Sequence, residues 1–488
     1  MADGAANLWA LADAHDGRVP AGMRRRSHQW TLRAVPVLLL VTVLGIVLAI
    51  PRELATEARL ALFAFGVAVI FWSLTKINAA YVALGAVLLA ILGGAIEQDE
   101  LFEALEADVI WLMIGAFVLG AAVRGTGLAE RLTRVVATRA RSIGQMFWMV
   151  TLTLLPLAFV IPSTSGRAAV AIPVFRSLSE AAGDPKVTRA LGLLIPTVIL
   201  VSTIASLIGA GSHLVANDLL DEVSDRRIGF AEWMLYGAPF GVVAAFVSTF
   251  VIGRLFLTGE QRRRPLTPAQ DLARPFTRNE AVTLLVIASM AMLWLTESVH
   301  GFKIAIVSVL GAFVLTLPGV GVLSWKNGLK AVSWSLLLFV GAALVLGEAL
   351  IETGAAKWLI GGLFDATGLN DGGSTLVVLL AVTLITLTSH VYLTSHTARA
   401  AALIPPLLYL AVSLNLNPVA MMFIGTVGMN YCLTFPVSSK ALLMFSELER
   451  ETWKPADLLK LSAVMIPAHA LLMVVFYYGW WRHVGLAL

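Results

Sequence analysis

Charged residues and cysteine are both scarce in this sequence. Aspartate, glutamate, lysine and arginine together make up 14% of the 488 residues, whereas ordinary soluble domains carry about 25%. Because 58% of the residues are hydrophobic, most of the surface must face something other than water. The sequence therefore predicts an all-α polytopic membrane protein. The single cysteine, Cys432, excludes an internal disulfide and any cysteine-based metal cluster.

The motifs of an intramembrane enzyme are also missing. We find no His-Glu-x-x-His, no Gly-x-Ser-x-Gly and no pair of carboxylates placed for acid–base chemistry, so we expect no enzymatic activity. The largest polar stretches, 1–33 and 258–278, are too short for a sensor or receptor domain. The net charge is +4, but the arginines stand in short loops between apolar runs, which indicates topology and not nucleic-acid binding.

Runs of roughly 20 apolar residues predict membrane-spanning helices. We expect about eleven, near 34–50, 58–75, 78–96, 108–125, 187–216, 233–257, 279–297, 301–317, 332–352, 416–445 and 458–484. Two further apolar segments, near 143–181 and 374–412, are too long for one span and have polar residues at the middle. Because non-helical backbone at membrane depth must line a cavity or be buried in protein, we expect a re-entrant helical hairpin in each.

Lysine and arginine are concentrated in alternate loops. The segment 1–33, with Arg24 to Arg26, and the basic loop 258–278 would be cytoplasmic, as would the loops with Lys76, with Arg131 to Arg141, and with Lys326 and Lys330. The external loops that alternate with them contain few basic residues. The positive-inside rule then predicts a protein of the cell (inner or plasma) membrane with a cytoplasmic N-terminus and an external C-terminus. The basic loop separates two expected repeats, 34–257 and 279–488.

One eleven-residue peptide occurs in each repeat. Ser163-Thr-Ser-Gly-Arg-Ala-Ala-Val-Ala-Ile-Pro173 returns as Ser395-His-Thr-Ala-Arg-Ala-Ala-Ala-Leu-Ile-Pro405, with six of eleven positions identical. We call these the first and second repeated peptides. A Thr-Gly pair precedes each, and an odd number of crossings between the repeats would place them inverted in the bilayer. Such repeats are typical of a secondary transporter.

Each repeated peptide has the residues of an anion site. A serine at the start of the following helix can cap it, and the helix N-terminus attracts negative charge. Arg167 and Arg399 follow their serines by four residues, on the same helix face, and a guanidinium binds carboxylate or sulfate bidentately. The two peptides together would hold a small divalent anion. The alternative for the arginines is snorkelling to a headgroup or pairing with a buried acid.

A break follows each repeated peptide in the next apolar run. Gly209-Ala-Gly211 precedes Ser212 and His213, and Phe435-Pro436 precedes Ser439 and Lys440. Interrupted helices at corresponding positions of two repeats point to a transport site. The histidines could carry protons or be hydrogen-bonded structural residues. We interpret Asn217 and Asp218 as solvated polar residues at a helix end.

The paired Ser-x-Thr hairpins that run into Ile-Pro, with Ile110-Trp-Leu-Met-Ile-Gly115 and the Thr-Gly pairs, resemble the divalent anion/sodium symporter family over nearly the whole chain. The resemblance implies a scaffold domain, a transport domain that moves like an elevator, a homodimer, and a dicarboxylate, tricarboxylate or sulfate as substrate. It implies substrate binding by Ser163, Thr164, Ser165, Arg167, Ser395, His396, Thr397, Arg399, Ser212, His213, Ser439 and Lys440.

The departures from the family concern sodium. The family's hairpin asparagine is Thr164 in one peptide and His396 in the other, and neither break keeps the family's Pro-Pro-Asn. Fixed cations oppose sodium binding by Coulomb repulsion, so the basic residues of the site could replace sodium as counter-charge. A sodium ion near Ser163, Gly209 and Ser395 remains the one candidate cofactor. Sodium-independent exchange, proton coupling, and an anion channel or carrier of another ion are the alternatives.

Overall fold

The structure, a computed structural model, describes residues 36–50, 54–75, 77–128, 131, 136, 139–161, 163–266, 275–356, 358, 374–448 and 452–488. These residues form two units, within 1–52 and 53–488. The first unit contains the helix Pro36–Ala49, and the second contains every element named below. The expected cytoplasmic segment 1–33 and the middle of the basic loop 258–278 lie outside the described residues.

The described residues are helical almost throughout. They contain no strand, only an isolated antiparallel bridge between Ser142 and Pro265. Among them, seven helices are long and apolar enough to cross a membrane, and shorter apolar helices accompany these. The part of the chain that the structure describes is therefore all-helical with several apolar helices, as the sequence predicted for a polytopic membrane protein.

The uninterrupted apolar helices are α3 (Thr56–Leu74), α4 (Ala79–Leu92), α6 (Asp108–Thr126), α12 (Phe230–Phe256), α14 (Arg278–Leu295), α16 (Ile304–Thr316), α18 (Trp334–Glu352) and α24 (Pro455–Gly479), of which α4 and α16 are shorter than the others. The short helices between and after them are α5 (Gln98–Glu103), α13 (Gly259–Arg263), α15 (Glu297–His300), α17 (Trp325–Lys330) and η7 (Trp481–His483).

Each half also contains two interrupted segments. In the first half these are α8 (Ile143–Leu154), η1 (Leu155–Phe159) and α9 (Thr164–Ala182), then α10 (Pro185–Val201), η2 (Thr203–Ala205), η3 (Leu207–Gly209) and α11 (Gly211–Ser224). In the second half they are α20 (Thr375–Thr388), η5 (Ser389–Val391) and α21 (His396–Ser413), then α22 (Pro418–Met429), η6 (Pro436–Ser438) and α23 (Lys440–Ser446). The first interruption of each half falls at the start of a repeated peptide, and the second falls at the predicted Gly- or Pro-containing break.

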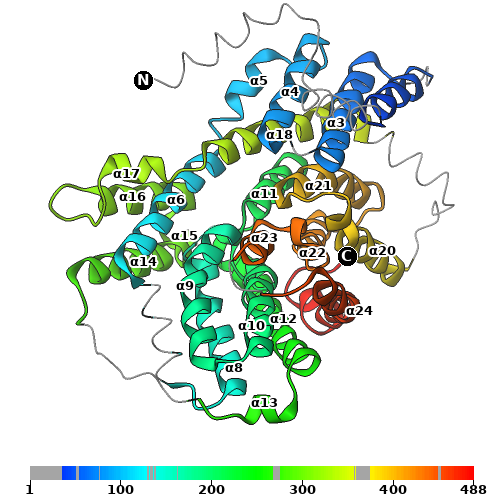
Figure 1. Cartoon of the computed structure of the whole chain (residues 1–488). Helices are drawn as coiled ribbons and strands as arrows, with labels where there is room; N and C mark the ends of the chain where they lie inside the picture. Colours follow the sequence, from blue (N-terminus) through cyan, green and yellow to red (C-terminus); the bar gives the residue numbers. More distant parts are fainter. Residues whose placement is uncertain are drawn as a thin grey trace, which may run out of the picture. The chain divides into compact units, whose positions relative to one another are not determined.

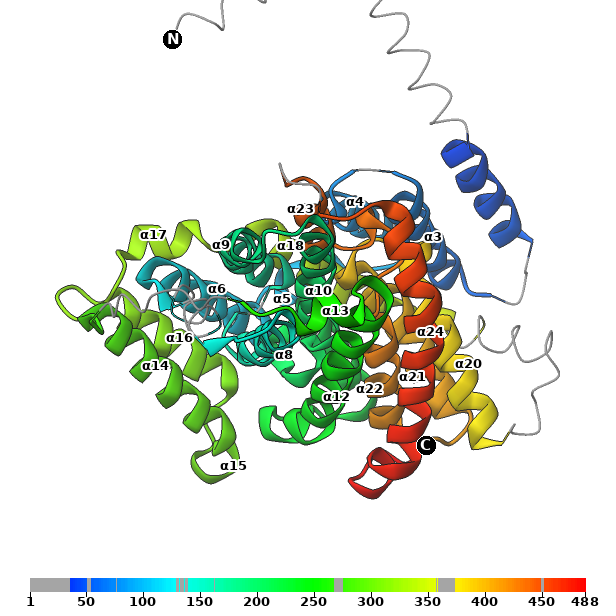
Figure 2. The same ribbon diagram turned by 60° about the horizontal axis from the view of Figure 1, so that its bottom comes forward.

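The helices of the second unit, which is one compact unit by its contacts, are divided here into two groups. The α6 group consists of α3, α4, α5, α6, α14, α16, α17 and α18, and its largest contact is between α6 and α16. The α11 group consists of α8 to α12 and α20 to α24, and its largest contact is between α11 and α21. In Figure 1 and Figure 2, α14, α16 and α17 lie beside α6, on the side away from α20 and α24. The groups meet mainly where α18 contacts α11 and α21.

Glycines explain two of the sequence patterns. Gly127 and Gly354, of the two Thr-Gly pairs, have φ of 83° and 73°. Glycine adopts this left-handed conformation with less strain than residues that have a Cβ, so each pair can end its helix, α6 or α18. Gly115 serves close packing instead, because a Cβ there would lie 2.5 Å from the main-chain carbonyl of Ser308 in α16.

Candidate functional site

The repeated peptides have the same local geometry in both halves. Ser163 caps α9 by accepting a hydrogen bond from the Gly166 amide at 3.2 Å, and its Oγ lies 3.0 Å from Ser165 Oγ. Ser395 caps α21 by accepting from the amide of residue 398 at 3.4 Å, and its Oγ lies 3.1 Å from Thr397 Oγ1. Both serines are partly exposed. The predicted serine caps are therefore confirmed, and each leaves hydroxyls and the first helical N–H groups together at one helix start.

The first arginine reaches the break that follows its peptide. Arg167 has no exposed surface, and its Nη2 donates to Thr203 Oγ1 at 2.9 Å and to the Gly209 carbonyl at 2.8 Å. Because the guanidinium is fully buried, it does not snorkel to a lipid headgroup. These two contacts are with a carbonyl and a hydroxyl, and neither is with an acidic side chain. Its Nε and Nη1 have no hydrogen-bond partner among the described residues.

The second arginine repeats the arrangement. Arg399 is also fully buried, and its Nη1 donates to the carbonyls of Met429 and Tyr431. Its Nη2 has no hydrogen-bond partner among the described residues. In both halves, therefore, the arginine of the repeated peptide binds main-chain oxygens that the interrupted helix leaves outside its regular hydrogen bonding.

The first break depends on a close approach of backbone to backbone. A Cβ at Gly209 would lie 2.2 Å from the Thr203 carbonyl oxygen, closer than real Cβ atoms come. The two short 3₁₀ turns η2 and η3 thus fold tightly together because residue 209 has no side chain. This fold presents the Gly209 carbonyl to Arg167.

The two halves converge at this break. The methyl carbon of Thr397, in the second repeated peptide, lies 3.3 Å from the position of a Cβ at Gly211. His213 Nε2 lies 2.7 Å from Asn430 Nδ2, and Asn430 follows α22 in the second half. Arg167 approaches the same stretch from the first repeated peptide. The segment from Gly209 to His213, which includes the start of α11, therefore contacts both repeated peptides.

His213 is bonded through both ring nitrogens. Nδ1 lies 2.9 Å from the Ser206 carbonyl and so donates to it, which leaves Nε2 to accept from the Asn430 amide. The ring is fully buried and stacks on Trp233 at a centroid distance of 5.0 Å. These partners suit a neutral imidazole that ties the halves together. Asn430 had only a weak signal in the sequence, because a polar residue after an apolar run is common.

The remaining predicted residues occupy varied surroundings. His396 is partly buried, and its Nε2 lies 3.3 Å from Cys432 Sγ. Ser439 caps α23 by accepting from the amide of residue 441 at 3.2 Å, whereas Lys440 is exposed. Ser212 is buried, and its hydroxyl has no hydrogen-bond partner among the described residues. The basic groups are thus unequal, since two guanidiniums are enclosed and the lysine is not.

Arg124 is a residue near the site that the sequence analysis did not select. It lies at the C-terminal end of α6, and its Nη1 is 3.5 Å from the position of a Cβ at Gly166 in the first repeated peptide. A cation is common at a helix C-terminus, so the sequence alone gave no reason to separate it from other loop arginines.

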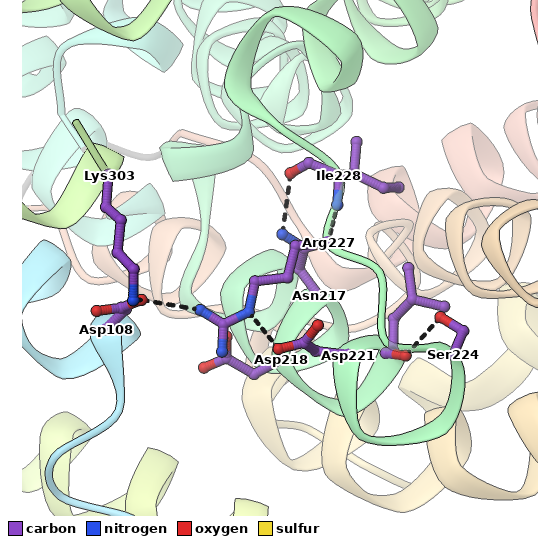
Figure 3. A network of polar contacts seen from close by, with 9 residues as sticks. Asp108, Asn217, Asp218, Asp221, Ser224, Arg227, Ile228 and Lys303 are labelled. Carbon is purple, nitrogen blue, oxygen red and sulfur yellow. Dashed lines mark hydrogen bonds and ion pairs between the residues drawn. The ribbon is translucent and has the colours of Figure 1, made fainter. Parts of the chain in front are cut away.

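Asn217 and Asp218 are not solvated, and that interpretation was wrong. Both residues are buried, with 6% of each exposed. Asn217 Nδ2 donates to the Ile228 carbonyl at 3.0 Å, and the Ile228 amide donates to Asn217 Oδ1 at 2.9 Å (Figure 3). The carboxylate of Asp218 lies 3.5 Å from the Arg227 guanidinium. The turn between α11 and α12 folds back over the end of α11 and covers these residues, which apolar periodicity could not predict.

Comparison with known proteins gives relatives across most of the chain. Residues 30–487 match the family model described as the sodium:sulfate symporter transmembrane region. A membrane protein of Cupriavidus necator is 26% identical, over 91% of this chain and 92% of its own length. The sodium-dependent dicarboxylate transporter SdcS of Staphylococcus saprophyticus is 24% identical over 76% of each chain.

A solved structure shares the fold. The YdaH transporter of Alcanivorax borkumensis aligns with a TM-score of 0.51, over 76% of this chain and 85% of that one. The sequence identity is 14%, so this similarity concerns the fold alone.

Proposed function

Because this chain belongs to the sodium:sulfate symporter family, we propose that it is a secondary active transporter of a small divalent anion, either a dicarboxylate, a tricarboxylate or sulfate. The observation that carries the proposal is the pair of capped helix starts at Ser163 and Ser395, whose peptides both contact the segment from Gly209 to the start of α11. Helix N-termini bind anions through N–H groups and the helix dipole. Two of them near one segment suit a doubly charged solute.

The ligands in this proposal are the hydroxyls and amides of the two peptides. Ser163, Thr164 and Ser165 would bind one end of the anion, and Ser395, His396 and Thr397 the other. Ser212, Ser439 and Lys440 would complete the site from the breaks. His213, whose two ring nitrogens are both hydrogen-bonded, would hold the first break in place instead of contacting the anion. Arg124 adds a cation from the α6 group near the first peptide.

Arg167 and Arg399 suggest how the anion is transported without sodium. In transporters with interrupted helices, carbonyls of unwound backbone commonly coordinate Na⁺. Here the guanidiniums of Arg167 and Arg399 donate to such carbonyls in both halves. We therefore propose that these permanent cations take the electrostatic role of sodium, although the staphylococcal relatives are named sodium-dependent. The arginines are too costly to move through the membrane without a counter-anion, which favours exchange of one anion for another.

The movement would be elevator-like. The α11 group carries both repeated peptides and both breaks, and it meets the α6 group through a limited set of helix contacts. We propose that the α11 group is the transport domain, that the α6 group is the scaffold, and that the chain forms a homodimer in the cell membrane with its N-terminus in the cytoplasm.

The test is uptake by purified protein in liposomes. Labelled succinate, citrate and sulfate are added outside, with the same anion or none trapped inside, and with or without a sodium gradient. We expect uptake that needs internal anion and is unchanged by sodium. An absolute sodium requirement would refute the role given to the arginines. Stimulation by a proton gradient with no internal anion would favour proton coupling, and conductive uptake without exchange would favour a channel.

A further inference from the structure

A cluster of charged side chains joins α6, the end of α11 and the segment before α16 (Figure 3). Asp108, the first residue of α6, accepts a hydrogen bond from Lys303 Nζ at 2.7 Å. Arg227, in the turn between α11 and α12, donates through Nη1 to the same carboxylate at 3.2 Å. Arg227 also donates to Asp221 at 2.8 Å and lies 3.5 Å from Asp218. One carboxylate, Asp108, is therefore shared by two cations.

The two cations come from different groups of helices. Lys303 directly precedes α16, which packs extensively on α6, so the Asp108–Lys303 pair lies within the α6 group. Asp218 and Asp221 are on α11, so their pairs with Arg227 lie within the α11 group. The Asp108–Arg227 pair is the contact of this cluster that crosses from one group to the other.

Asp108 and Arg227 each keep another ion-pair partner if the α6 group and the α11 group separate. Without Arg227, Asp108 still binds Lys303 and stays at the positive N-terminal end of α6, where a carboxylate is favourable. Without Asp108, Arg227 still binds Asp221. Breaking the crossing pair thus leaves no charge without an opposite charge nearby. Asp108 and Arg227 are also partly exposed, at 32% and 38% of their side chains, so water can replace the lost contact.

The boundary between the groups is loosely packed at this place. A cavity of about 510 Å³ is lined by Asp108 and Leu112 from α6, by Leu214 and Asp218 from α11, and by Lys303. Two other ion pairs among the described residues involve loop arginines that follow α6 and α13. Arg131 binds Glu280 of α14 at 2.8 Å, and Arg264 lies 3.7 Å from Asp184 at the start of α10.

We propose that Asp108 and Arg227 form a reversible ionic latch, which holds the α11 group against the α6 group in the conformation described here and opens once in each transport cycle. The inference rests on the proposed elevator-like movement and adds a specific contact that the movement must break. The spare partners, Lys303 and Asp221, make the latch easy to open and close.

Cross-linking tests whether the pair must open. In a variant with Asp108→Cys and Arg227→Cys, a short bifunctional thiol reagent that contains a reducible disulfide would join the two groups. The native Cys432 is fully buried and should not react. We expect anion exchange in liposomes to fall by at least about tenfold on cross-linking and to recover on reduction, because the movement is blocked. Unchanged exchange by the cross-linked protein would overturn the latch.

The matched control joins two positions within one group. Asp108→Cys with Lys303→Cys offers the same reagent a similar pair, and cross-linking there should leave exchange intact. Equal loss of exchange in both variants would mean that the reagent disturbs α6 itself, and would also overturn the proposal. Anion exchange is also measured after the cross-link has been reduced. If the reduced proteins do not exchange anions, the proposed function fails; if they do and cross-linking has no effect, only the latch fails.

A distance measurement needs no substrate. Spin labels at Lys326→Cys in α17 and Ser413→Cys in α21, both exposed positions, report the separation of the two groups by pulsed electron resonance. We expect two populations of distances. One population should correspond to the conformation in which Asp108 contacts Arg227. Arg227→Gln should lower this population by roughly two- to fivefold relative to the other, which is the range for a partly exposed ion pair. An unchanged ratio would contradict the latch.

Discussion

At the scale of single residues, the main feature is a pair of enclosed cations. Arg167 and Arg399 come from equivalent positions of the two repeated peptides, and each binds oxygens of the interrupted helix that follows. A buried charge is tolerated when its surroundings supply oriented dipoles. Here the breaks supply carbonyl oxygens. The arginines therefore stabilise the breaks whatever else they do, and their unpaired donors remain for a counter-anion.

Removing either arginine should affect both stability and binding. Arg167→Gln or Arg399→Gln leaves buried carbonyl oxygens without their donor, which costs about 1–3 kcal/mol of folding free energy. Loss of the positive charge should also weaken anion affinity roughly tenfold or more. Thermal unfolding and calorimetric titration of the purified protein measure the two effects.

A matched control for these variants is Arg254→Gln. Arg254 lies near the end of α12, where its guanidinium stacks on Phe250, and it is exposed. We expect little change in anion affinity for this variant. Unchanged affinity in both the Arg167 and the Arg399 variants would remove these residues from the proposed mechanism.

At the scale of the elements, the interruptions position the site. Continuous helices would satisfy their own carbonyls and leave no N-terminus in the interior. The chain instead ends α10 at Val201 and starts α11 at Gly211, with two tight turns between. The same organisation recurs between α22 and α23. Because α10 is almost completely enclosed by other helices, the first break is held deep within its group.

The first break can be tested through its glycine. Gly209→Ala would place a Cβ 2.2 Å from the Thr203 carbonyl oxygen, so η2 and η3 must move apart. We expect destabilisation of about 1–3 kcal/mol and a loss of anion exchange, because Arg167 loses the Gly209 carbonyl. Thermal unfolding and liposome exchange are the measurements.

Gly253→Ala is the control for this prediction. Gly253 lies within α12, and a Cβ there meets no atom within 4 Å. Alanine should be neutral or stabilise the helix by up to about 1 kcal/mol. If Gly209→Ala behaved like Gly253→Ala, the break would not need its close backbone approach.

At the scale of the whole molecule, the sequence predicted the apolar helices, the interruptions and the serine caps. It did so because these features leave local signals: long apolar runs, Gly- or Pro-containing breaks, and a serine before a helical stretch. It did not predict the partners of Arg167 and Arg399, because these partners include main-chain oxygens. Every residue has a main-chain oxygen, so the sequence does not indicate which of them an arginine will bind. Nor did it predict the Asp108–Arg227 contact, whose residues are 119 positions apart.

The error at Asn217 and Asp218 has the same origin. Polar residues near the end of an apolar run are usually solvated, and only the return of the turn at Ile228 encloses them here. Contacts between distant segments follow from packing, which a single sequence does not display. The roles of the substrate-binding residues, the homodimer and the orientation in the membrane stay predictions.

The stoichiometry of anion binding without sodium tests whether the two halves form a single site. We expect one divalent anion per chain by calorimetry in sodium-free buffer, with Ser163→Ala and Ser395→Ala each weakening binding roughly fivefold or more. Ser324→Ala, which removes the similar cap of α17, should leave affinity unchanged. Binding only in the presence of sodium, or sensitivity to one of the two serines alone, would contradict a single site formed by both halves.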